Sequence, residues 1–320
     1  MARYGYLLPT RGSVLTSGDA QTLAAKTAAD VIGLAGRGEA LGFDSVWVGD
    51  SVLAKPRHDP LSTLAALATA TDSVGLGTAV HLPPLRHPVH VAHRTATVDQ
   101  LAGGRLRWGA GVGSGPAVEA EYENLGVPYA ERGARMDELL EVVTALWDGD
   151  PVDYDGTYYQ LEDASIGFSP PGDLPIYIAT SAFDEFPSRV LDRIATHADG
   201  WFPISLSPEA YSTGLETVRD AVSEADRSPD SVDPAFYLDV VIDDDEAGAI
   251  DAARDFYERY YPAMTDPSDE EVRTHGVFGT ADAVAERIEA YQDAGVETLV
   301  VRFTSAEQRA QLQRFADLAL

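Results

Sequence analysis

The chain of 320 residues contains no cysteine. Disulfide scaffolds, thiolate nucleophiles, zinc–thiolate sites and iron–sulfur clusters are therefore all excluded. Long apolar runs are also missing, because no stretch approaches the roughly 18 consecutive apolar residues that a membrane-spanning helix needs. The opening segment, MARYGYLLP, is too short and too polar for a secretory signal. We expect a cytoplasmic protein that does not enter a membrane.

Positive charge is scarce as well. The sequence carries 23 Lys plus Arg against 52 Asp plus Glu, a formal net charge of −29, and just Lys26 and Lys55 are lysine. Such a chain repels nucleic acids and anionic membranes, which excludes both as partners. Many acids with few lysines are typical of proteins in concentrated salt, where self-repulsion is screened. We predict a halophilic protein; the alternative is an acidic enzyme from an ordinary cytoplasm.

Motifs for metal binding and serine nucleophiles are lacking too. The seven histidines form no HExxH motif, and His90 and His93 share one helical face that we interpret as polar surface. The run Gly113-Ser114-Gly115 has neither the spacing nor the strand–turn–helix context of a nucleophile elbow. We therefore predict neither a metal site nor a serine nucleophile.

What the sequence does contain is a regular alternation of short apolar runs with longer amphipathic stretches. Repeated strand–helix units predict a parallel sheet, and eight strands close a TIM (β/α)8 barrel. An open doubly wound sheet in two domains is the alternative, which the missing glycine-rich fingerprint after the first strand disfavours. The predicted strands are 3–9, 44–50, 74–82, 105–111, 175–180, 200–203, 235–242 and 296–303. Helices are expected between them, the first at 19–41 and the last at 307–320.

The alternation is interrupted once, after the fourth strand–helix unit. Residues 151–172 contain DYDGTYYQLEDA, in which Asp-Gly separates two β-forming runs. This pattern is typical of a β-hairpin. We interpret the segment as a hairpin-like insertion within a single barrel domain that spans residues 1–320.

In such barrels the active site lies at the carboxyl ends of the strands. Residues 109–115, GAGVGSG, end the fourth strand. Their backbone amides could line a flat ligand or hold an anion; the alternative is a strand end that packs tightly in the barrel. Thr180 and Ser181 precede a helix, where they bind phosphate or cap the helix. His81, after the third strand, is the best-placed group for proton transfer because imidazole titrates near neutral pH; the alternative is a structural histidine.

Several stretches together resemble one family, the bacterial-luciferase-like oxidoreductases that use a flavin or the deazaflavin F420. They occur in order and cover nearly the whole chain, and they are specific to the superfamily rather than to one reaction. The stretches are ALGFDSVWVGDS (40–51), RHDPLSTLAALATATDSVGLGTAVHLPPLRHPV (57–89), ATVDQLAGGRLRWGAGVG (96–113), LGVPYAERGARMDELLEVVTALWDG (125–149), GTYYQLEDA (156–164), ADGWFP (198–203) and GTADAVAERIEAYQDAGVETLVVRF (279–303).

The resemblance implies a TIM-like barrel with an insertion, usually dimeric, that holds F420 or FMN at its carboxyl-terminal mouth. It implies a non-prolyl cis peptide at Ala79–Val80 behind the cofactor ring. It further implies contacts from Asp50 and Ser51 near the ring and from the 179–181 loop near the cofactor phosphate. The expected cofactor-binding residues are thus Asp50, Ser51, Ala79, Val80, His81, Gly111, Gly113, Ser114, Thr180 and Ser181.

The chain departs from the family pattern at three places. Ser51 follows Asp50 where many F420-dependent members have histidine, and Pro116 follows the glycine-rich run where the sugar-phosphate dehydrogenases have an acid. Ala179-Thr180 replaces the commoner Gly-Gly. With two lysines in the chain, we expect phosphate contacts that do not depend on lysine.

The resemblance predicts an oxidoreductase that moves hydride (with F420) or oxygen (with reduced FMN and O2) to a small organic substrate, with His81 as the candidate catalytic residue. A partner flavin reductase or F420 reductase would supply the reduced cofactor. Two alternatives stay open: reduction of a methylene-tetrahydropterin or folate carrier, and a non-catalytic barrel that binds cofactor.

Overall fold

The sheet of this protein curves round until its two ends meet. The computed structural model describes residues 2–11, 20–55, 57–181, 186–261 and 264–320. Eight parallel strands pair in the order β11, β1, β2, β3, β4, β7, β8 and β9, and β9 pairs with both β8 and β11 to close the ring. The predicted TIM barrel is confirmed. Its strands are β1 (Arg3–Leu7), β2 (Ser45–Val48), β3 (Gly75–Thr78), β4 (Leu106–Ala110), β7 (Ile176–Thr180), β8 (Gly200–Pro203), β9 (Asp233–Ile242) and β11 (Thr298–Phe303).

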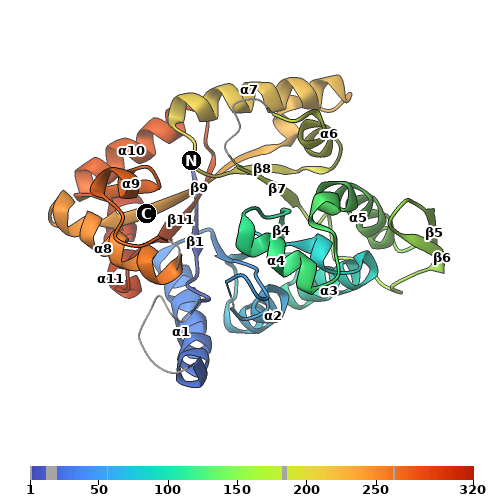
Figure 1. The fold of residues 1–320 in the computed structure, drawn as a ribbon, viewed down its shortest axis with the longest axis horizontal. Helices are drawn as coiled ribbons and strands as arrows, with labels where there is room; N and C mark the ends of the chain where they lie inside the picture. Colours follow the sequence, from blue (N-terminus) through green and yellow to red (C-terminus); the bar gives the residue numbers. More distant parts are fainter. Residues whose placement is uncertain (1, 12–19, 56, 182–185, 262–263) are drawn as a thin grey trace.

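Helices cover the outside of the barrel (Figure 1). Proline in the first turn, together with side-chain N-caps such as Asp59, Ser207, Asp245 and Thr280, fixes where several of them begin. The helices are α1 (Ala20–Leu41), α2 (Pro60–Ala70), α3 (Pro88–Ala102), α4 (Pro116–Asn124), α5 (Arg132–Trp147), α6 (Ser188–His197), α7 (Pro208–Glu224), α8 (Glu246–Tyr260), α9 (Asp269–Arg273), α10 (Ala281–Asp293) and α11 (Gln308–Ala319). Asp19, the expected start of the first helix, lies outside the described residues. None of the described helices is long and apolar enough to span a bilayer.

The barrel interior is filled by large side chains that glycines make room for. Trp47 on β2 is fully buried and packs with Tyr177 and Phe202. Gly77 on β3 faces Trp47 in register, and a Cβ there would lie 2.2 Å from the indole ring. We call Trp47, Tyr177 and Phe202 the barrel plug. They fill the barrel below the carboxyl ends of its strands, so a ligand that enters from that end reaches only as far as the plug.

Several described elements, among them the short helix α9, lie outside the eight strand–helix units that the sequence predicts. The insertion forms the expected hairpin, β5 (Val152–Asp155) and β6 (Gln160–Ala164), at one edge of the molecule (Figure 1). The short strand β10 (Gly276–Gly279) adds to β9 beside the ring and was not predicted, because GVFG is brief and bounded by glycine. Helix α4 was not predicted either, because its sequence, PAVEAEYEN, is short and has few large apolar residues.

Candidate active site

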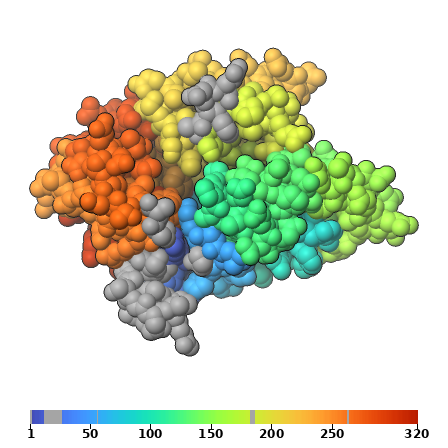
Figure 2. Space-filling model, in the orientation of Figure 1, coloured from blue at the N-terminus to red at the C-terminus, as the bar shows by residue number. Residues whose placement is uncertain are grey.

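A cavity of about 330 Å³ opens at the carboxyl ends of the barrel strands. This volume lies within the range of small-molecule and cofactor pockets. Figure 2 shows the surface hollowed where the orange, yellow and green parts of the chain meet. The walls come from the loops after β2, β3, β4 and β7, from β8 and β9, and from the end of α8. The cavity is therefore where the fold places active sites in barrels of this kind.

The structure brings together nearly all the residues that the sequence singled out. His81 alone does not line the cavity. The nine that do are Asp50, Ser51, Ala79, Val80, Gly111, Gly113, Ser114, Thr180 and Ser181.

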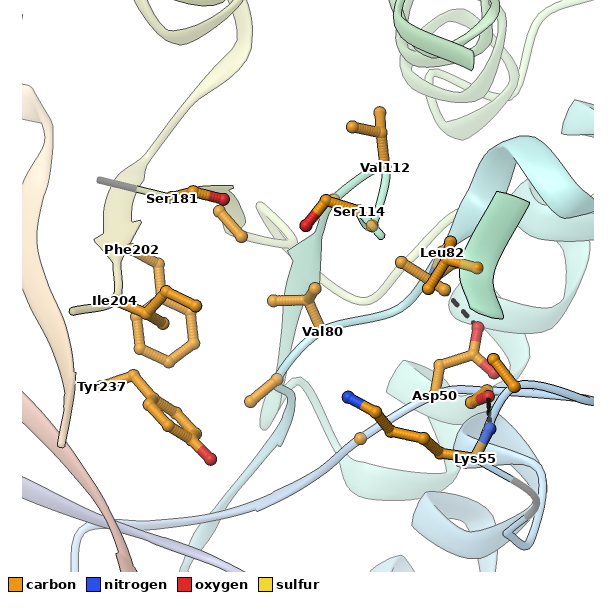
Figure 3. Close-up of a pocket in the computed structure, with 18 of the residues that line it drawn as sticks. Asp50, Lys55, Val80, Leu82, Val112, Ser114, Ser181, Phe202, Ile204 and Tyr237 are labelled. Carbon is orange, nitrogen blue, oxygen red and sulfur yellow. Dashed lines mark hydrogen bonds between the residues drawn. The ribbon is translucent and has the colours of Figure 1, made fainter. Parts of the chain in front are cut away.

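The floor of the cavity is the segment after β3. The peptide bond between Ala79 and Val80 is cis, as the resemblance implies, and the Val80 side chain stands in the middle of the cavity (Figure 3). Gly109 and Gly111 on the β4 side let this segment approach: a Cβ on Gly109 would lie 1.9 Å from the Thr78 carbonyl oxygen, and one on Gly111 would lie 2.9 Å from Val80 Cγ2. The glycine-rich run thus packs tightly, as one of its two interpretations predicts, and it also lines the cavity; ligand contact by these glycines stays a prediction.

Asp50 is held by a network that the sequence did not predict. Its carboxylate accepts two hydrogen bonds from Arg86, at 2.5 and 3.0 Å, and one from the Leu82 amide at 3.0 Å. Burial raises the pKa of Asp50, but His81, Arg86 and the Leu82 amide together outweigh burial and lower it below its ordinary value. Asp50 is therefore a fixed carboxylate, with a side chain that is 2% exposed.

His81 lies next to Asp50, does not line the cavity, and is fully buried. Its Nδ1 accepts a hydrogen bond from Trp108 Nε1 at 3.1 Å, which leaves the ring proton on Nε2, 3.8 Å from Asp50 Oδ2. Burial lowers the pKa of His81 to about 4. The imidazole is therefore neutral at pH 7.

A buried carboxylate, Glu121 on α4, also lines the cavity. Its Oε1 accepts hydrogen bonds from the amides of Val52 and Leu53 and from Ser51 Oγ at 3.3 Å. Its Oε2 is buried without a hydrogen-bond partner among the described residues. Sequence reasoning missed Glu121 because it missed the helix; Pro116 in the first turn was the available signal.

Thr180 and Ser181 form the end of the cavity at β7. Thr180 Oγ1 accepts a hydrogen bond from Trp201 Nε1 at 3.0 Å, and the residue is 6% exposed. Ser181 is exposed and its side chain lies in the cavity opening (Figure 3). Of these two residues, Ser181 is the one whose hydroxyl is accessible to a ligand in the cavity.

The opposite end of the cavity is cationic and aromatic, and sequence reasoning missed it. Lys55, Arg57 and Arg302 line it together with Tyr260 and Tyr261. Burial raises the pKa of Tyr260, but the charges of Arg57, Arg302 and Lys55 outweigh burial and lower it to about 7. The tyrosines lie at the end of helix α8 rather than after a strand, so the strand-end rule did not point to them.

A cluster of three or more His, Asp or Glu side chains that could hold a metal ion is not found among the described residues.

Similarity to known proteins shows the family of this chain. The model of the luciferase-like monooxygenase family matches residues 2–298.

The chain belongs to the luciferase-like monooxygenase family. It is 33% identical over 309 residues to an F420-dependent glucose-6-phosphate dehydrogenase of Beutenbergia cavernae, covering 87% of this chain and 88% of the relative. It is 29% identical over 213 residues to a 5,10-methylenetetrahydromethanopterin reductase of Archaeoglobus fulgidus, covering 67% of this chain and 60% of the relative.

Solved structures of luciferase-like enzymes share the fold. The monooxygenase RslO1 from Streptomyces bottropensis superposes with a TM-score of 0.82 at 23% identity, covering 99% of this chain and 98% of that one. An F420-dependent secondary alcohol dehydrogenase superposes with a TM-score of 0.81 at 20% identity, with the same coverage. The predictions of a luciferase-like barrel and of an oxidoreductase are confirmed.

Proposed function

We propose that this luciferase-like protein is an F420-dependent oxidoreductase that transfers hydride to or from a small organic substrate. The observation that carries the proposal is the similarity along 87% of the chain to an F420-dependent dehydrogenase. Two of the similar proteins have F420-dependent in their names, and a Baeyer-Villiger monooxygenase solved in complex with FMN shares the fold. These names support the prediction of F420 or FMN as cofactor, and the similarity in sequence favours F420. A reduced-FMN monooxygenase is the second candidate, favoured by the name of the family whose model matches the chain.

The residues of the cavity fit a flat cofactor with a phosphate-bearing tail. Val80 offers an apolar platform above the barrel plug, and Gly111 and Gly113 expose backbone beside it. Ser181, Thr180 and Ser114 offer hydroxyls at one end of the cavity, where we place the phosphate. F420, when bound, supplies two-electron hydride chemistry. The protein orients it against the Ala79–Val80 floor and keeps water out.

His81 and Asp50 act in this proposal by holding the floor. His81 is neutral and does not line the cavity, so we assign it a positioning role rather than the proton transfer predicted from sequence. Asp50 fixes the segment after β3 through the Leu82 amide and Arg86. Glu121 fixes the loop after β2 in the same way, through Val52 and Leu53.

Glucose 6-phosphate does not follow from the similarity. The sugar-phosphate dehydrogenases carry an acid where this chain has Pro116, and many F420-dependent members carry histidine where it has Ser51. Pro116 begins α4, and Ser51 Oγ is engaged by Glu121 and by the Lys55 amide. We therefore propose hydride transfer with a substrate other than glucose 6-phosphate.

The proposal is tested by fluorescence titration with F420 and FMN, each oxidised and reduced, in molar KCl. We expect F420 to bind and FMN to bind at least tenfold more weakly. Ser181→Asp should weaken F420 binding at least tenfold, because the new carboxylate repels a phosphate. Ser231→Asp, which adds the same charge at an exposed position outside the cavity, is the control.

Preference for reduced FMN would replace the proposal with the monooxygenase, and failure of every cofactor to bind would favour the non-catalytic barrel. Strong binding of a methylene-pterin carrier as substrate would favour the reductase reading. We also propose that the protein is cytoplasmic, as its sequence predicts, and that it is a homodimer, as the resemblance implies, supplied with reduced cofactor by an F420 reductase. Sedimentation velocity in molar KCl measures the assembly state.

A further inference from the structure

Four cations surround one tyrosine ring at the end of the cavity away from Ser181. We call Arg11, Lys55, Arg57 and Arg302 the cationic cluster. The Arg302 and Arg11 guanidinium carbons lie 4.8 and 5.3 Å from the centre of the Tyr260 ring. Lys55 Nζ and the Arg57 guanidinium carbon lie 5.4 and 5.6 Å from the same point. Four of the 23 Lys and Arg residues of a strongly acidic protein thus lie around one ring.

Within the part of the chain that the structure describes, a carboxylate pairs with just one of these cations. Arg302 forms a buried pair with Asp239, with an Nε to Oδ1 distance of 2.7 Å. Among the described residues, Arg11, Lys55 and Arg57 form no ion pair with a carboxylate. Arg57 instead donates to the Tyr260 hydroxyl at 2.7 Å and to the Lys55 carbonyl oxygen at 3.2 Å, and Arg11 donates to the Tyr260 carbonyl oxygen.

Burial makes this excess of positive charge unfavourable. Burial lowers the pKa of Lys55 and of Arg11, because desolvation penalises the charged form, and the charge of Arg57 lowers both further, whereas Tyr260 opposes the shift. A partly buried cluster of unpaired cations is stable when an anion lies among them. Tyr260 is such an anion when it is ionised, and it then neutralises at most one of the three unpaired charges.

The cluster faces the same cavity as the proposed cofactor site but at its other end. Lys55, Arg57 and Arg302 all line the cavity, and Lys55 extends its side chain toward the cavity centre (Figure 3). Ser114 and Ser181 lie on one side of Val80 in this view, and Lys55 lies on the other. An anion at the cluster is therefore distinct from a phosphate at Ser181. Phe202 and Tyr237 provide an apolar wall between the two ends.

We propose that the cationic cluster binds an oxyanion, a carboxylate or a phosphate, on the substrate of this enzyme. Lys55 provides three donors as a point charge, and the guanidinium groups of Arg57 and Arg302 provide planar ones. The oxyanion anchors one end of the substrate, and the remainder lies toward Val80, where the proposed hydride transfer takes place. The assignment as a substrate site rests on the proposed function, whereas anion binding itself does not.

The test measures two probe anions by isothermal titration calorimetry at constant ionic strength: inorganic phosphate and benzoate. We expect at least one to bind the wild-type protein and to bind Lys55→Met at least tenfold more weakly. Lys55→Arg, which keeps the charge, should restore binding to within about threefold. Arg287→Met is the matched control, because Arg287 lies 5.2 Å over the Tyr291 ring, outside the cavity. Tighter phosphate binding indicates a phosphorylated substrate, and tighter benzoate binding indicates a carboxylate.

Three results would overturn the proposal: neither probe binds, Lys55→Met binds like the wild type, or phosphate binding is lost in Ser181→Asp but kept in Lys55→Met. Titration with F420 on the same variants separates this inference from the proposed function. Wild type that binds F420 but neither probe disproves the anion site alone. Wild type that binds a probe through Lys55 but no cofactor disproves the proposed function alone. Retained F420 binding and circular dichroism show that Lys55→Met is folded.

Discussion

At the scale of single residues, burial decides which titratable groups can do chemistry. His81 is the residue that sequence reasoning favoured for proton transfer, and it is fully buried. Its tautomer is set by Trp108, and its pKa is lowered to about 4 by burial. Lys55 and Tyr260, which sequence reasoning passed over, are among the titratable groups that line the cavity.

The buried imidazole predicts a specific loss of stability in acid. The unfolded chain takes up a proton on His81 near pH 6.5, whereas the folded protein does so only near pH 4. The unfolded state therefore binds more protons in this window, and the free energy of unfolding falls as the pH drops through it, by up to about 3 kcal/mol.

His81→Asn keeps a hydrogen-bond acceptor for Trp108 and does not titrate in this range. We expect the wild type to lose stability relative to His81→Asn between pH 6.5 and 4, as measured by urea unfolding at each pH in constant KCl. A difference between the two proteins that stays constant across these pH values would contradict the buried neutral imidazole.

At the scale of elements, the strands were predictable and the site-forming loops were not. All eight barrel strands and the β5–β6 hairpin lie where apolar runs and an Asp-Gly turn indicate them. Such patterns are local, so one sequence suffices to read them. The partners of Asp50, the role of Glu121 and the gathering of Lys55 and Tyr260 depend on contacts between segments far apart in the chain, which no local pattern encodes.

The packing of β2 on β3 gives the second prediction. Gly77→Ala places a methyl group 2.2 Å from the Trp47 ring, inside a plug with no space to yield. We expect a loss of about 1–3 kcal/mol or more in the free energy of unfolding. Gly36→Ala is the matched control, because a Cβ at this α1 position meets nothing within 4 Å.

Chemical denaturation measures both variants. Gly36→Ala should raise the free energy of unfolding by about 0.5–1 kcal/mol, because alanine favours a helix interior over glycine. Equal effects of the two substitutions would show that Trp47 tolerates a side chain at position 77.

At the scale of the whole molecule, the net charge of −29 predicts that salt stabilises the fold. The Debye length falls from about 10 Å at 0.1 M salt to about 3 Å at 1 M, which screens the repulsion between surface carboxylates. We expect the melting temperature to rise with KCl, mostly between 0.1 and 1 M. Sucrose, an uncharged stabiliser, is the control for general exclusion effects. A melting temperature that does not change with KCl would contradict the prediction of a halophilic protein and favour an acidic enzyme from an ordinary cytoplasm.

The position of Lys55 also makes the cavity chemically addressable. The chain has no thiol and only two lysine side chains, and one of them lies in the cavity with a lowered pKa. A lowered pKa increases the share of neutral, nucleophilic amine at a given pH. An amine-reactive ester with an apolar ring and a negative group would therefore label this cavity with little competition. Because lysine is scarce in this chain, the candidate active site can be labelled covalently at Lys55 without introducing a cysteine.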